Sequence, residues 1–261
     1  MPELPEVEMV RRFVEERCQG RTISRLKVID EGILDGIGKE ALVRSVQGRR
    51  IVAVKRHGKQ LFLELSDGVL TVHLGMTGDL LMLNRKERTP SHVRVLIILE
   101  DGTRLAYDDP RKFGAIGIAS SANEFVTERR LGPDALQISS KEFVERAHSS
   151  RRAIKSVLLD QHVLAGVGNL YADEALYQAK VHPLTPANEL SNPILKKIWA
   201  RIRQVLRISI DVSPDFSKLP GGFLLRSRVA GGPCSLGHGR LQAIKVGGRT
   251  TIFCPNCQRI I

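Results

Sequence analysis

The apolar residues of this chain change their spacing partway along it, and that change limits the folds it can adopt. From residue 23 to about residue 118 they occur in short runs rich in β-branched side chains, separated by turns such as Ser66-Asp67-Gly68. Such runs are typical of β-strands, and we expect strands at 51–54, 61–65, 69–74, 93–99 and 116–118. After residue 140 the spacing becomes helical, and we expect helices at 141–148, 151–164, 170–178 and 193–210. The sequence therefore predicts an α+β protein that begins with an antiparallel β-sandwich or barrel.

Breaks between these runs predict four segments. A helix begins at Leu4-Pro5-Glu6 and ends at Gly20, ahead of the strands. A polar stretch follows the strands, and a short basic tail with cysteines follows the helices. We therefore expect a helix with strands at 1–119, a linker at 120–140, a helical domain at 141–222 and the tail at 223–261.

The net charge is concentrated near the C-terminus. Forty Lys and Arg residues against 28 Asp and Glu residues give a formal charge of +12. Residues 191–261 hold 12 basic and two acidic residues, a net of +10, which leaves +2 for the first 190 residues. A basic segment on a nearly neutral body favours a polyanion as partner, nucleic acid before membrane. A solubilising surface is the alternative.

Composition argues against several classes of protein. No apolar run approaches the ~18 residues of a membrane span, and the opening MPELPEVE lacks the basic-then-apolar pattern of a signal peptide. With 42% hydrophobic and 26% charged residues, the chain is not typical of disorder. We expect a cytoplasmic protein without a membrane partner.

The tail carries a metal-binding pattern. Three residues separate Cys234 from His238, two separate Cys254 from Cys257, and 15 lie between the pairs. Two close pairs at this separation suit a tetrahedral structural zinc between two hairpin tips. A redox pair at Cys254 and Cys257, or unligated cysteines, is the alternative. Cys18 lies outside the pattern, and we expect it to be half-buried and without chemistry.

The N-terminus offers a nucleophile. Removal of Met1 would leave Pro2 with a free secondary amine, and an α-amino group has a pKa of roughly 7.7–8.0. Such an amine attacking the anomeric carbon of a sugar gives an iminium, which is a strong electron sink. Glu3 beside it could move protons. Because many proteins begin with Met-Pro, this feature is informative only together with others.

Six motifs in one order carry a family resemblance. They are MPELPEVE, KRHGKQLF, HLGMTG, DDPRKFG, GVGNLYADEAL and the cysteine pattern of the tail, and they extend from Pro2 to Gln258. Together they resemble the formamidopyrimidine-DNA glycosylase family, which includes the endonuclease VIII enzymes. The resemblance implies an N-terminal β-sandwich catalytic domain, a DNA-binding helical domain with a helix–two-turns–helix motif, and a C-terminal zinc finger.

The resemblance implies a base-excision enzyme with four catalytic residues. Pro2 would displace the damaged base of a flipped-out nucleotide and form a Schiff base with the opened sugar. Glu3 matches the acid/base residue at the sugar, and Lys59 matches the lysine that assists elimination of the 3′ phosphate. Arg249 matches the finger arginine that grips the phosphate next to the lesion and is assigned to the second elimination. Without the resemblance, Lys59 would pass for an ordinary charge at a strand end.

The resemblance also implies residues that fill the hole left in the duplex by flipping. Met76, Arg111 and Phe113 match this set. Taken singly, Met76 and Phe113 could be core residues and Arg111 a surface charge. The polar turn at 108–114 is, however, an unusual place for a core aromatic and a natural one for a probing loop.

Further DNA contacts are implied for His92, Arg151, Lys155 and Asn169. Lys155 matches a lysine that faces the DNA, although a solvent-facing lysine would look the same. Asn169 precedes a helix, so we also expect free backbone N–H groups at this turn to suit a phosphate.

The chain departs from the family pattern at several places. Gly237 stands where a second cysteine is usual, so His238 would replace that ligand from one position further on. Asp108 replaces the usual asparagine. The glycine-rich loop that folds over the extruded base in 8-oxoguanine-cutting members is shortened here to 213–222, and the usual tyrosine-containing segment reads Ser227-Arg228-Val229-Ala230.

We therefore expect a monomeric, nucleoid-associated DNA glycosylase and AP lyase with one structural zinc, which nicks double-stranded DNA at oxidised or abasic sites by β,δ-elimination. Leu4 and the complete set of Met76, Arg111 and Phe113 favour the purine-directed branch, with ring-opened purines and 8-oxoguanine as lesions, over the oxidised-pyrimidine branch. The short loop favours the opposite branch, or ring-opened purines and other lesions that need little capping. The alternatives are a specificity for oxidised pyrimidines and a non-catalytic binder of damaged or abasic DNA. An RNA-binding zinc protein would make Glu3 and Lys59 coincidences.

Overall fold

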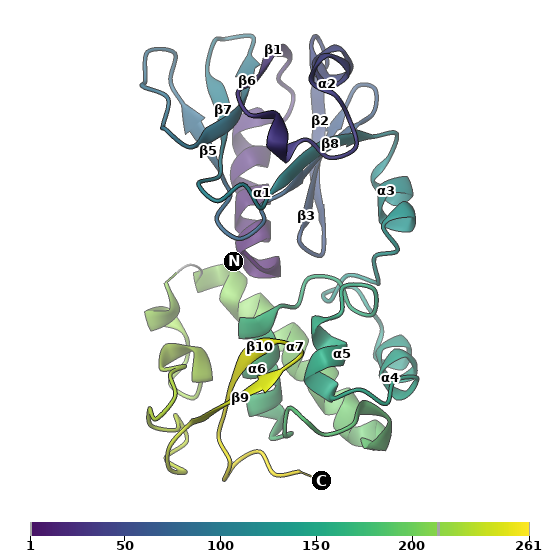
Figure 1. Cartoon of the computed structure of the whole chain (residues 1–261), viewed down its shortest axis with the longest axis vertical. Coiled ribbons are helices and arrows are strands. Elements are labelled where there is room, and N and C mark those ends of the chain that lie inside the picture. The colour runs from purple at the N-terminus through teal and green to yellow at the C-terminus, as the bar shows by residue number, and fades with distance from the viewer. Residues whose placement is uncertain (1, 213–214, 261) are drawn as a thin grey trace. The chain divides into compact units, whose positions relative to one another are not determined.

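The computed structural model describes residues 2–212 and 215–260, which form two compact units (Figure 1). The first unit contains Pro2 and Glu6–Arg130. The second contains Glu3–Pro5 and Leu131–Ile261, so it draws on both ends of the chain. Each unit has its own large cluster of buried apolar side chains.

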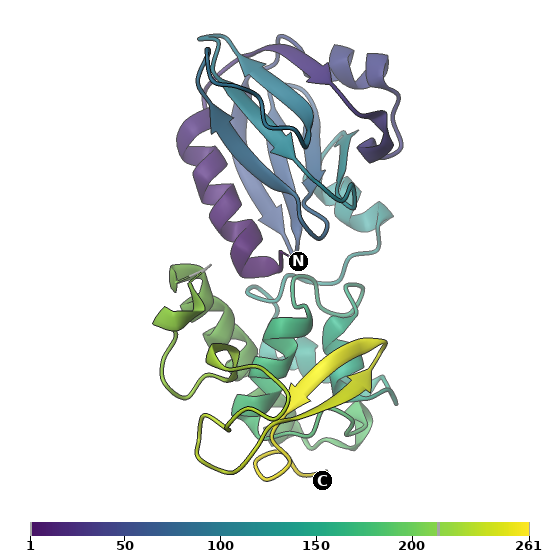
Figure 2. The same ribbon diagram turned by 60° about the vertical axis from the view of Figure 1, so that its left-hand side comes forward.

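Two antiparallel sheets dominate the described part of the first unit (Figures 1 and 2). One has the strand order β1 (Ile23–Val28), β6 (Val93–Leu99), β7 (Arg104–Asp108) and β5 (Asp79–Leu83). The other has the order β2 (Ile51–His57), β3 (Gln60–Leu65), β4 (Val69–His73) and β8 (Ala115–Ala119). Apolar residues of both sheets belong to one core cluster, which confirms the predicted antiparallel sandwich.

Helix α1 (Leu4–Cys18) contributes to the same core. Val7, Val14 and Cys18 are completely buried among the strand residues, and Gly20 ends the helix region with a φ of +82°. Cys18 is therefore more deeply buried than expected. Burial raises the pKa of Cys18 to about 11, so its side chain is a neutral thiol at physiological pH.

Two short helices were not predicted. Helix α2 (Lys39–Val46) lies within the region expected to be all β, and helix α3 (Ala122–Glu128) lies within the expected linker. Each buries few side chains, with Phe125 the buried residue of α3. Ser121 caps α3, because its side chain accepts a hydrogen bond from the backbone N–H of Glu124 at 3.1 Å. Elements this short contribute too few apolar residues for a periodic signal.

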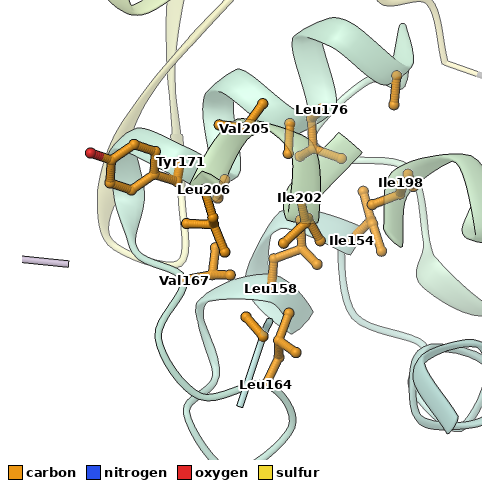
Figure 3. Packing of buried hydrophobic residues seen from close by; sticks show 14 of the residues in the cluster. Ile154, Leu158, Leu164, Val167, Tyr171, Leu176, Ile198, Ile202, Val205 and Leu206 are labelled. Atoms are coloured by element: carbon orange, nitrogen blue, oxygen red, sulfur yellow. The ribbon is translucent and has the colours of Figure 1, made fainter. Parts of the chain in front are cut away.

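The second unit is built on helices. They are α4 (Ser140–His148), α5 (Ile154–Leu159), α6 (Asn169–Ala179) and α7 (Asn192–Val212), with a one-turn helix η2 (Ala187–Glu189). Figure 3 shows Ile154 and Leu158 of α5 with Leu176 of α6 and Ile202 of α7 in the cluster that these helices bury. Helices α4, α6 and α7 agree with the predicted ranges to within two residues.

The predicted helix at 151–164 was too long. Helix α5 covers only Ile154–Leu159. After it, the Asp160 carboxylate accepts the backbone N–H of His162 at 3.0 Å, and the side chain of Gln161 bonds the backbone of Gly166 and Val167 at 2.9 Å. These side-chain bonds compete with the helical pattern, which apolar spacing alone does not reveal.

After α7 come two one-turn helices, η3 (Phe216–Lys218) and η4 (Leu224–Arg226), and a hairpin of β9 (Gln242–Val246) and β10 (Arg249–Phe253). Gly247 and Gly248 form the two-residue turn, with φ of +55° and +74°. A turn with two left-handed residues matches the twist of a hairpin and favours glycine. Among residues 2–212 and 215–260, no helix combines the length and apolar character needed to cross a bilayer.

Glu174 connects α6 to η4 from inside the second unit. It is completely buried, and its carboxylate accepts hydrogen bonds from the backbone N–H of Leu225 and from Gln178 Nε2, each at 2.8 Å. Burial raises the pKa of Glu174 to about 7, although these hydrogen bonds oppose the shift. Because its pKa is higher in the folded state, Glu174 favours folding most below pH 4.5, and that contribution is lost as the pH rises through about 7.

Replacing Glu174 with Gln should therefore flatten the pH dependence of stability. Between pH 4.5 and pH 7.5, the free energy of unfolding of the wild type should fall relative to that of Glu174→Gln by on the order of 3 kcal/mol. Urea unfolding followed by the fluorescence of Trp199, the single tryptophan, reports on this unit. Equal pH slopes in the two proteins would contradict the assignment.

Candidate functional site

Glu3 caps helix α6 from a distant part of the sequence. Its side chain is 1% exposed, and its two carboxylate oxygens accept the backbone N–H groups of Leu170 and Tyr171 at 2.9 and 3.3 Å. The backbone N–H of Leu4 also donates to the carbonyl of Gly166 at 3.1 Å. A carboxylate at this position satisfies N–H groups that lack helical partners and interacts favourably with the helix dipole. The residue that follows Pro2 is therefore held in a fixed place.

This contact corrects one expectation. The N–H groups at the start of α6 were expected to be free for a phosphate, but those of Leu170 and Tyr171 bond Glu3. The chain thus places an internal carboxylate where an external anion was predicted.

Gly168 is the residue that leaves room for Glu3. It occupies the N-cap of α6 without a side-chain cap of its own. A Cβ at this position would lie 2.3 Å from Glu3 Cδ and 2.5 Å from Glu3 Oε1, both far inside contact distance. A glycine is required here by space, since the backbone φ of −128° suits any residue.

Lys155 is not on the surface, contrary to the expectation that it faces DNA. It is 0% exposed, and its Nζ lies 2.5 Å from Asp173 Oδ1, 2.8 Å from Asn169 Oδ1 and 2.6 Å from Thr251 Oγ1. Burial lowers the pKa of Lys155, and the carboxylates of Asp173 and Glu3 oppose that shift. A lysine held by three partners inside the protein is a fixed structural cation.

The other expected contacts of this unit lie closer to solvent. Asn169 is half-buried and its Nδ2 donates to the carbonyl of Thr250 at 3.0 Å. Arg249 is exposed at the first position of β10, one residue before Thr250. Arg151 is exposed ahead of α5. The structure therefore brings Asn169 and the strand that carries Arg249 together.

Three of the four expected metal ligands converge in the tail. The Sγ atoms of Cys234, Cys254 and Cys257 lie within 4.8 Å of one another, with 3.6 Å between Cys234 and Cys257. His238 lies beside them, with its Nδ1 3.0 Å from the Sγ of Cys257. Three cysteine sulfurs this close could hold a metal ion.

The sulfur of Cys234 also contacts the helical part of the unit. The Tyr177 hydroxyl of α6 lies 3.0 Å from it. Burial raises the pKa of Cys234, but hydrogen bonds from Tyr177 and from the backbone of Leu236 and His238 outweigh burial and lower the pKa to about 7. Cys234 therefore loses its proton more readily than an isolated thiol does.

In the first unit, Asp109 joins two loops that carry three of the expected DNA contacts. Asp109 is completely buried and accepts the Thr77 hydroxyl at 2.7 Å and the backbone N–H of Gly114 at 2.8 Å. These hydrogen bonds lower the pKa of Asp109 although burial opposes them. Gly75, with a φ of +61°, lies so close that a Cβ there would be 2.4 Å from the carbonyl carbon of Phe113. Asp109 and this close approach therefore hold the two loops against each other.

Met76, Arg111 and Phe113 are presented by these joined loops. Phe113 is 55% exposed, and the Arg111 guanidinium lies 4.8 Å from its ring centroid. Met76 is half-buried, and His92, whose carbonyl accepts the N–H of Asp109 at 3.0 Å, is exposed nearby. An exposed aromatic stacked on an arginine excludes the core alternative for Phe113.

Lys59 lies at the turn between β2 and β3. The guanidinium of Arg56 fixes this turn, because it donates to the carbonyl of Gly58 at 2.9 Å while it is ion-paired with Glu8 of α1 at 3.2 Å. Burial and the positive charge of Lys59 together lower the pKa of His73 on the neighbouring strand. Sequence reasoning noted the motif HLGMTG but missed His73 within it, since a lone histidine in a strand carries no distinctive spacing.

Two expectations fall partly outside the described residues. They are the removal of Met1, which is not described, and the shortened loop at 213–222, of which residues 213 and 214 are not described. In the rest of that loop, Asp215 accepts the backbone N–H of Ser217 at 3.1 Å, and Leu219 is buried in the core of the second unit.

Gly168→Ala should displace Glu3 from the start of α6. The added Cβ collides with the carboxyl group, so the free energy of unfolding should fall by about 1–3 kcal/mol. Gly38→Ala is the matched control, because Gly38 is the N-cap of α2, with an extended backbone and open space around its Cα. There the change should stay below about 1 kcal/mol. Urea unfolding measures both, and equal losses would refute the steric argument.

Two protein-family models match the chain. The formamidopyrimidine-DNA glycosylase N-terminal domain matches residues 1–116, and the formamidopyrimidine-DNA glycosylase H2TH domain matches residues 131–219. Together they cover most of the sequence.

Curated relatives and solved structures are similar over nearly the full length. The formamidopyrimidine-DNA glycosylase of Pelobacter propionicus is 36% identical over 268 residues, and that of Acidithiobacillus ferrooxidans is 34% identical over 271, with 99% of this chain and 100% of each relative covered. Among solved structures, LlFpg in complex with a THF-DNA and an inhibitor has a TM-score of 0.90 at 31% identity and covers 99% of this chain and 100% of its own. Lactococcus lactis Fpg bound non-covalently to DNA with an AP site has a TM-score of 0.89 at 30% identity and covers 98% and 99%. On these matches, the chain belongs to the formamidopyrimidine-DNA glycosylase family.

Proposed function

We propose that this chain is a bifunctional DNA glycosylase and AP lyase of base excision repair, acting on double-stranded DNA with oxidised or abasic sites. The observation that carries the proposal is the buried Glu3 carboxylate, fixed on the start of α6 directly after Pro2. The matched relatives named formamidopyrimidine-DNA glycosylase, and the Lactococcus lactis structures with THF-containing or AP-site DNA, support it. Association with the nucleoid would follow from DNA binding.

In this proposal, Pro2 and Glu3 carry out the chemistry at the sugar. The Pro2 nitrogen forms a bond to C1′ as the bond from C1′ to the base breaks, and ring opening gives an iminium. Glu3 moves protons at the sugar, and its two backbone donors keep the carboxylate oriented beside the nucleophile. The iminium then accepts the electrons released when a C2′ proton leaves, and the 3′ phosphate departs.

Fixed cations would assist the two eliminations. Lys59, on the turn that Arg56 holds in place, assists departure of the 3′ phosphate. Arg249 holds the phosphate that leaves in the second elimination. A leaving phosphate gains negative charge as its bond to carbon breaks, so a cation already in position lowers the barrier.

The joined loops of the first unit would occupy the duplex after base flipping. Met76 acts as the wedge, and the stacked Arg111 and Phe113 engage the orphaned base. His92, Arg151 and Asn169 contact phosphates. We assign no direct DNA contact to Lys155, because its buried Nζ already holds Asn169 in place.

We also propose that the segments predicted from the sequence are domains with separate functions. A catalytic part at 1–119 would be followed by a linker at 120–140, a DNA-binding helical part at 141–222 and a finger at 223–261. The end of the first unit at Arg130, and family matches at 1–116 and 131–219, are compatible with this division.

The metal in the finger would be a single structural zinc held by Cys234, His238, Cys254 and Cys257. The sulfur separation of 3.6 Å and the histidine nitrogen beside Cys257 fit a tetrahedral sulfur–nitrogen set. One matched Lactococcus lactis structure, at 32% identity and a TM-score of 0.89, is a variant with Gly-His in place of a cysteine, bound to a THF-containing DNA. In this chain Gly237-His238 stands where the family usually has its second cysteine.

For the lesion, we propose ring-opened purines first and 8-oxoguanine second. The exposed Arg111 and Phe113 pair supports this branch. Oxidised pyrimidines are the alternative. Duplexes that each carry one lesion, compared for the rate of base release, decide between the two classes.

Borohydride should trap a covalent adduct at Pro2. The test uses full-length protein whose mass proves removal of Met1, with a duplex that carries an abasic site, and peptide mapping locates the adduct. Glu3→Gln keeps an acceptor for Leu170 and should bind the duplex nearly as well, but it should lose base release from lesion DNA because the amide cannot exchange protons.

Several outcomes would count against this reading. If processed protein gives no adduct on any abasic or lesion duplex, the lyase activity is absent and the non-catalytic binder is favoured. Protein that retains Met1 would have a blocked amine and would favour the same alternative. Unchanged base release by Glu3→Gln would remove its assigned role.

Metal analysis should find one zinc per chain, lost in Cys257→Ser and after treatment with a chelator. Because the finger buries only a small apolar cluster, loss of zinc should unfold the hairpin and weaken binding to a tetrahydrofuran-containing duplex roughly tenfold. Cys18→Ala is the control, since Cys18 lies in the other unit. Retention of zinc in His238→Ala would reject His238 as the fourth ligand, and unchanged affinity without zinc would reject the finger.

A further inference from the structure

We infer that Asp173 is a positioning residue that holds Asn169 and the strand of Arg249 in one arrangement for adjacent phosphates. The inference rests on the proposed function, because it concerns two of the proposed phosphate contacts of the second unit, Asn169 and Arg249. Asp173 itself is 2% exposed and touches no surface that DNA could reach.

Asp173 lies between two cations and one backbone donor. Its Oδ1 is 2.5 Å from Lys155 Nζ. Its Oδ2 accepts Arg228 Nη2 at 2.6 Å and Nε at 2.9 Å, and also the backbone N–H of Ile252 at 2.9 Å. One carboxylate thus joins the helical part of the unit to two parts of the C-terminal segment, Arg228 and strand β10.

Through Lys155, Asp173 sets the orientation of Asn169. Lys155 donates to Asn169 Oδ1 at 2.8 Å, which turns the amide so that Nδ2 donates to the carbonyl of Thr250 at 3.0 Å. An amide nitrogen has two N–H groups, so the second can donate to a phosphate. Without Asp173, Lys155 would lose the charge that balances it and holds it against Asn169.

Asp173 also fixes the strand that begins with Arg249. Thr250, Thr251 and Ile252, the next three residues, are each held by this network, through Arg228 Nη2 at 3.1 Å, Lys155 Nζ at 2.6 Å and Asp173 itself at 2.9 Å. The backbone directly after Arg249 is thereby held in place, while the Arg249 side chain stays exposed. Such supporting groups matter because small misplacements of a charge reduce its effect on a reaction.

The charges explain why this carboxylate cannot be replaced without effect. Lys155 is completely buried and the side chain of Arg228 is only 16% exposed. Asp173→Asn would leave two cations around a neutral amide, and they would repel each other in a poorly solvated place. We expect both to move, and Asn169 and β10 to move with them.

The test separates the two eliminations. Wild type and Asp173→Asn are incubated with a labelled duplex that carries one abasic site, at a temperature at which both are folded. Borohydride trapping at Pro2 should stay within about twofold, whereas the ratio of β,δ product to β product should fall roughly tenfold, less than the loss of a transition-state donor outright. Arg249→Ala should change the product ratio in the same direction.

Binding gives a second readout that does not need catalysis. For a tetrahydrofuran-containing duplex, the plot of log affinity against log salt should be less steep in Asp173→Asn than in the wild type. The difference in slope should be about that expected for the loss of one phosphate contact. Glu174→Gln is the matched control, because it removes the neighbouring buried carboxylate, which faces η4 and not β10. Glu174→Gln should keep both the product ratio and the salt slope of the wild type.

An unchanged product ratio and salt slope in Asp173→Asn would overturn the inference, and so would equal changes in Glu174→Gln. If Asp173→Asn does not fold, Arg228→Gln decides, since it keeps the Lys155–Asp173 pair and removes only the contacts of Arg228 to Asp173 and Thr250. It should shift the product ratio roughly threefold, about 0.7 kcal/mol, and no shift would overturn the inference. If the wild type itself forms no adduct, the lyase function fails, and the salt slope alone still decides the role of Asp173.

Discussion

The contact between Glu3 and the start of α6 is the interaction on which the site depends. It buries a carboxylate at a helix N-terminus, satisfies two backbone donors, and needs a glycine at position 168 to make room. The same contact fixes Glu3, the proposed proton carrier, directly after Pro2. One pair of hydrogen bonds therefore both caps the helix and positions this carboxylate. Pre-organisation of this kind is more effective than a mobile N-terminus, because no ordering cost remains when the substrate arrives.

Buried carboxylates recur as organisers in both units, and each has a different set of partners. Asp109 joins two loops through hydroxyl and backbone donors, Asp173 balances two cations, and Glu174 accepts backbone and amide donors. The pKa values of Asp109 and Glu174 follow these partners. The pKa of Asp109 is lowered by its hydrogen bonds, whereas burial dominates at Glu174 and raises its pKa to about 7. Hydrogen-bond donors, and not burial alone, decide whether such a group stays charged.

Much of the fold could be predicted from apolar spacing, whereas the interior of the site could not. Strands β2, β3, β4, β6 and β8 and helices α4, α6 and α7 lie where apolar spacing predicted them, whereas the other strands were not predicted by range. Helix α5 was overestimated, because the side chains of Asp160 and Gln161 bond the backbone locally. Lys155 was misplaced for a related reason, since a sequence gives the charge of a lysine but not its partners. Arg228 and Asp173 lie 55 residues apart and have no motif in common, so their pairing appears only in the folded chain.

The second unit includes Glu3–Pro5, and this has a consequence for how the chain is made. Leu4 is completely buried in the helical core, although it leaves the ribosome more than 120 residues before the rest of that unit at Leu131. The first unit can therefore fold during synthesis while Glu3–Pro5, which belong to the second unit, still lack the residues that bury them. Closing so long a loop is entropically costly, but the cost grows only slowly with length. The helical core is complete only when Leu4 and the segment from Leu131 onward are both present, and an isolated fragment from Leu131 onward would lack both its helix cap and one core side chain.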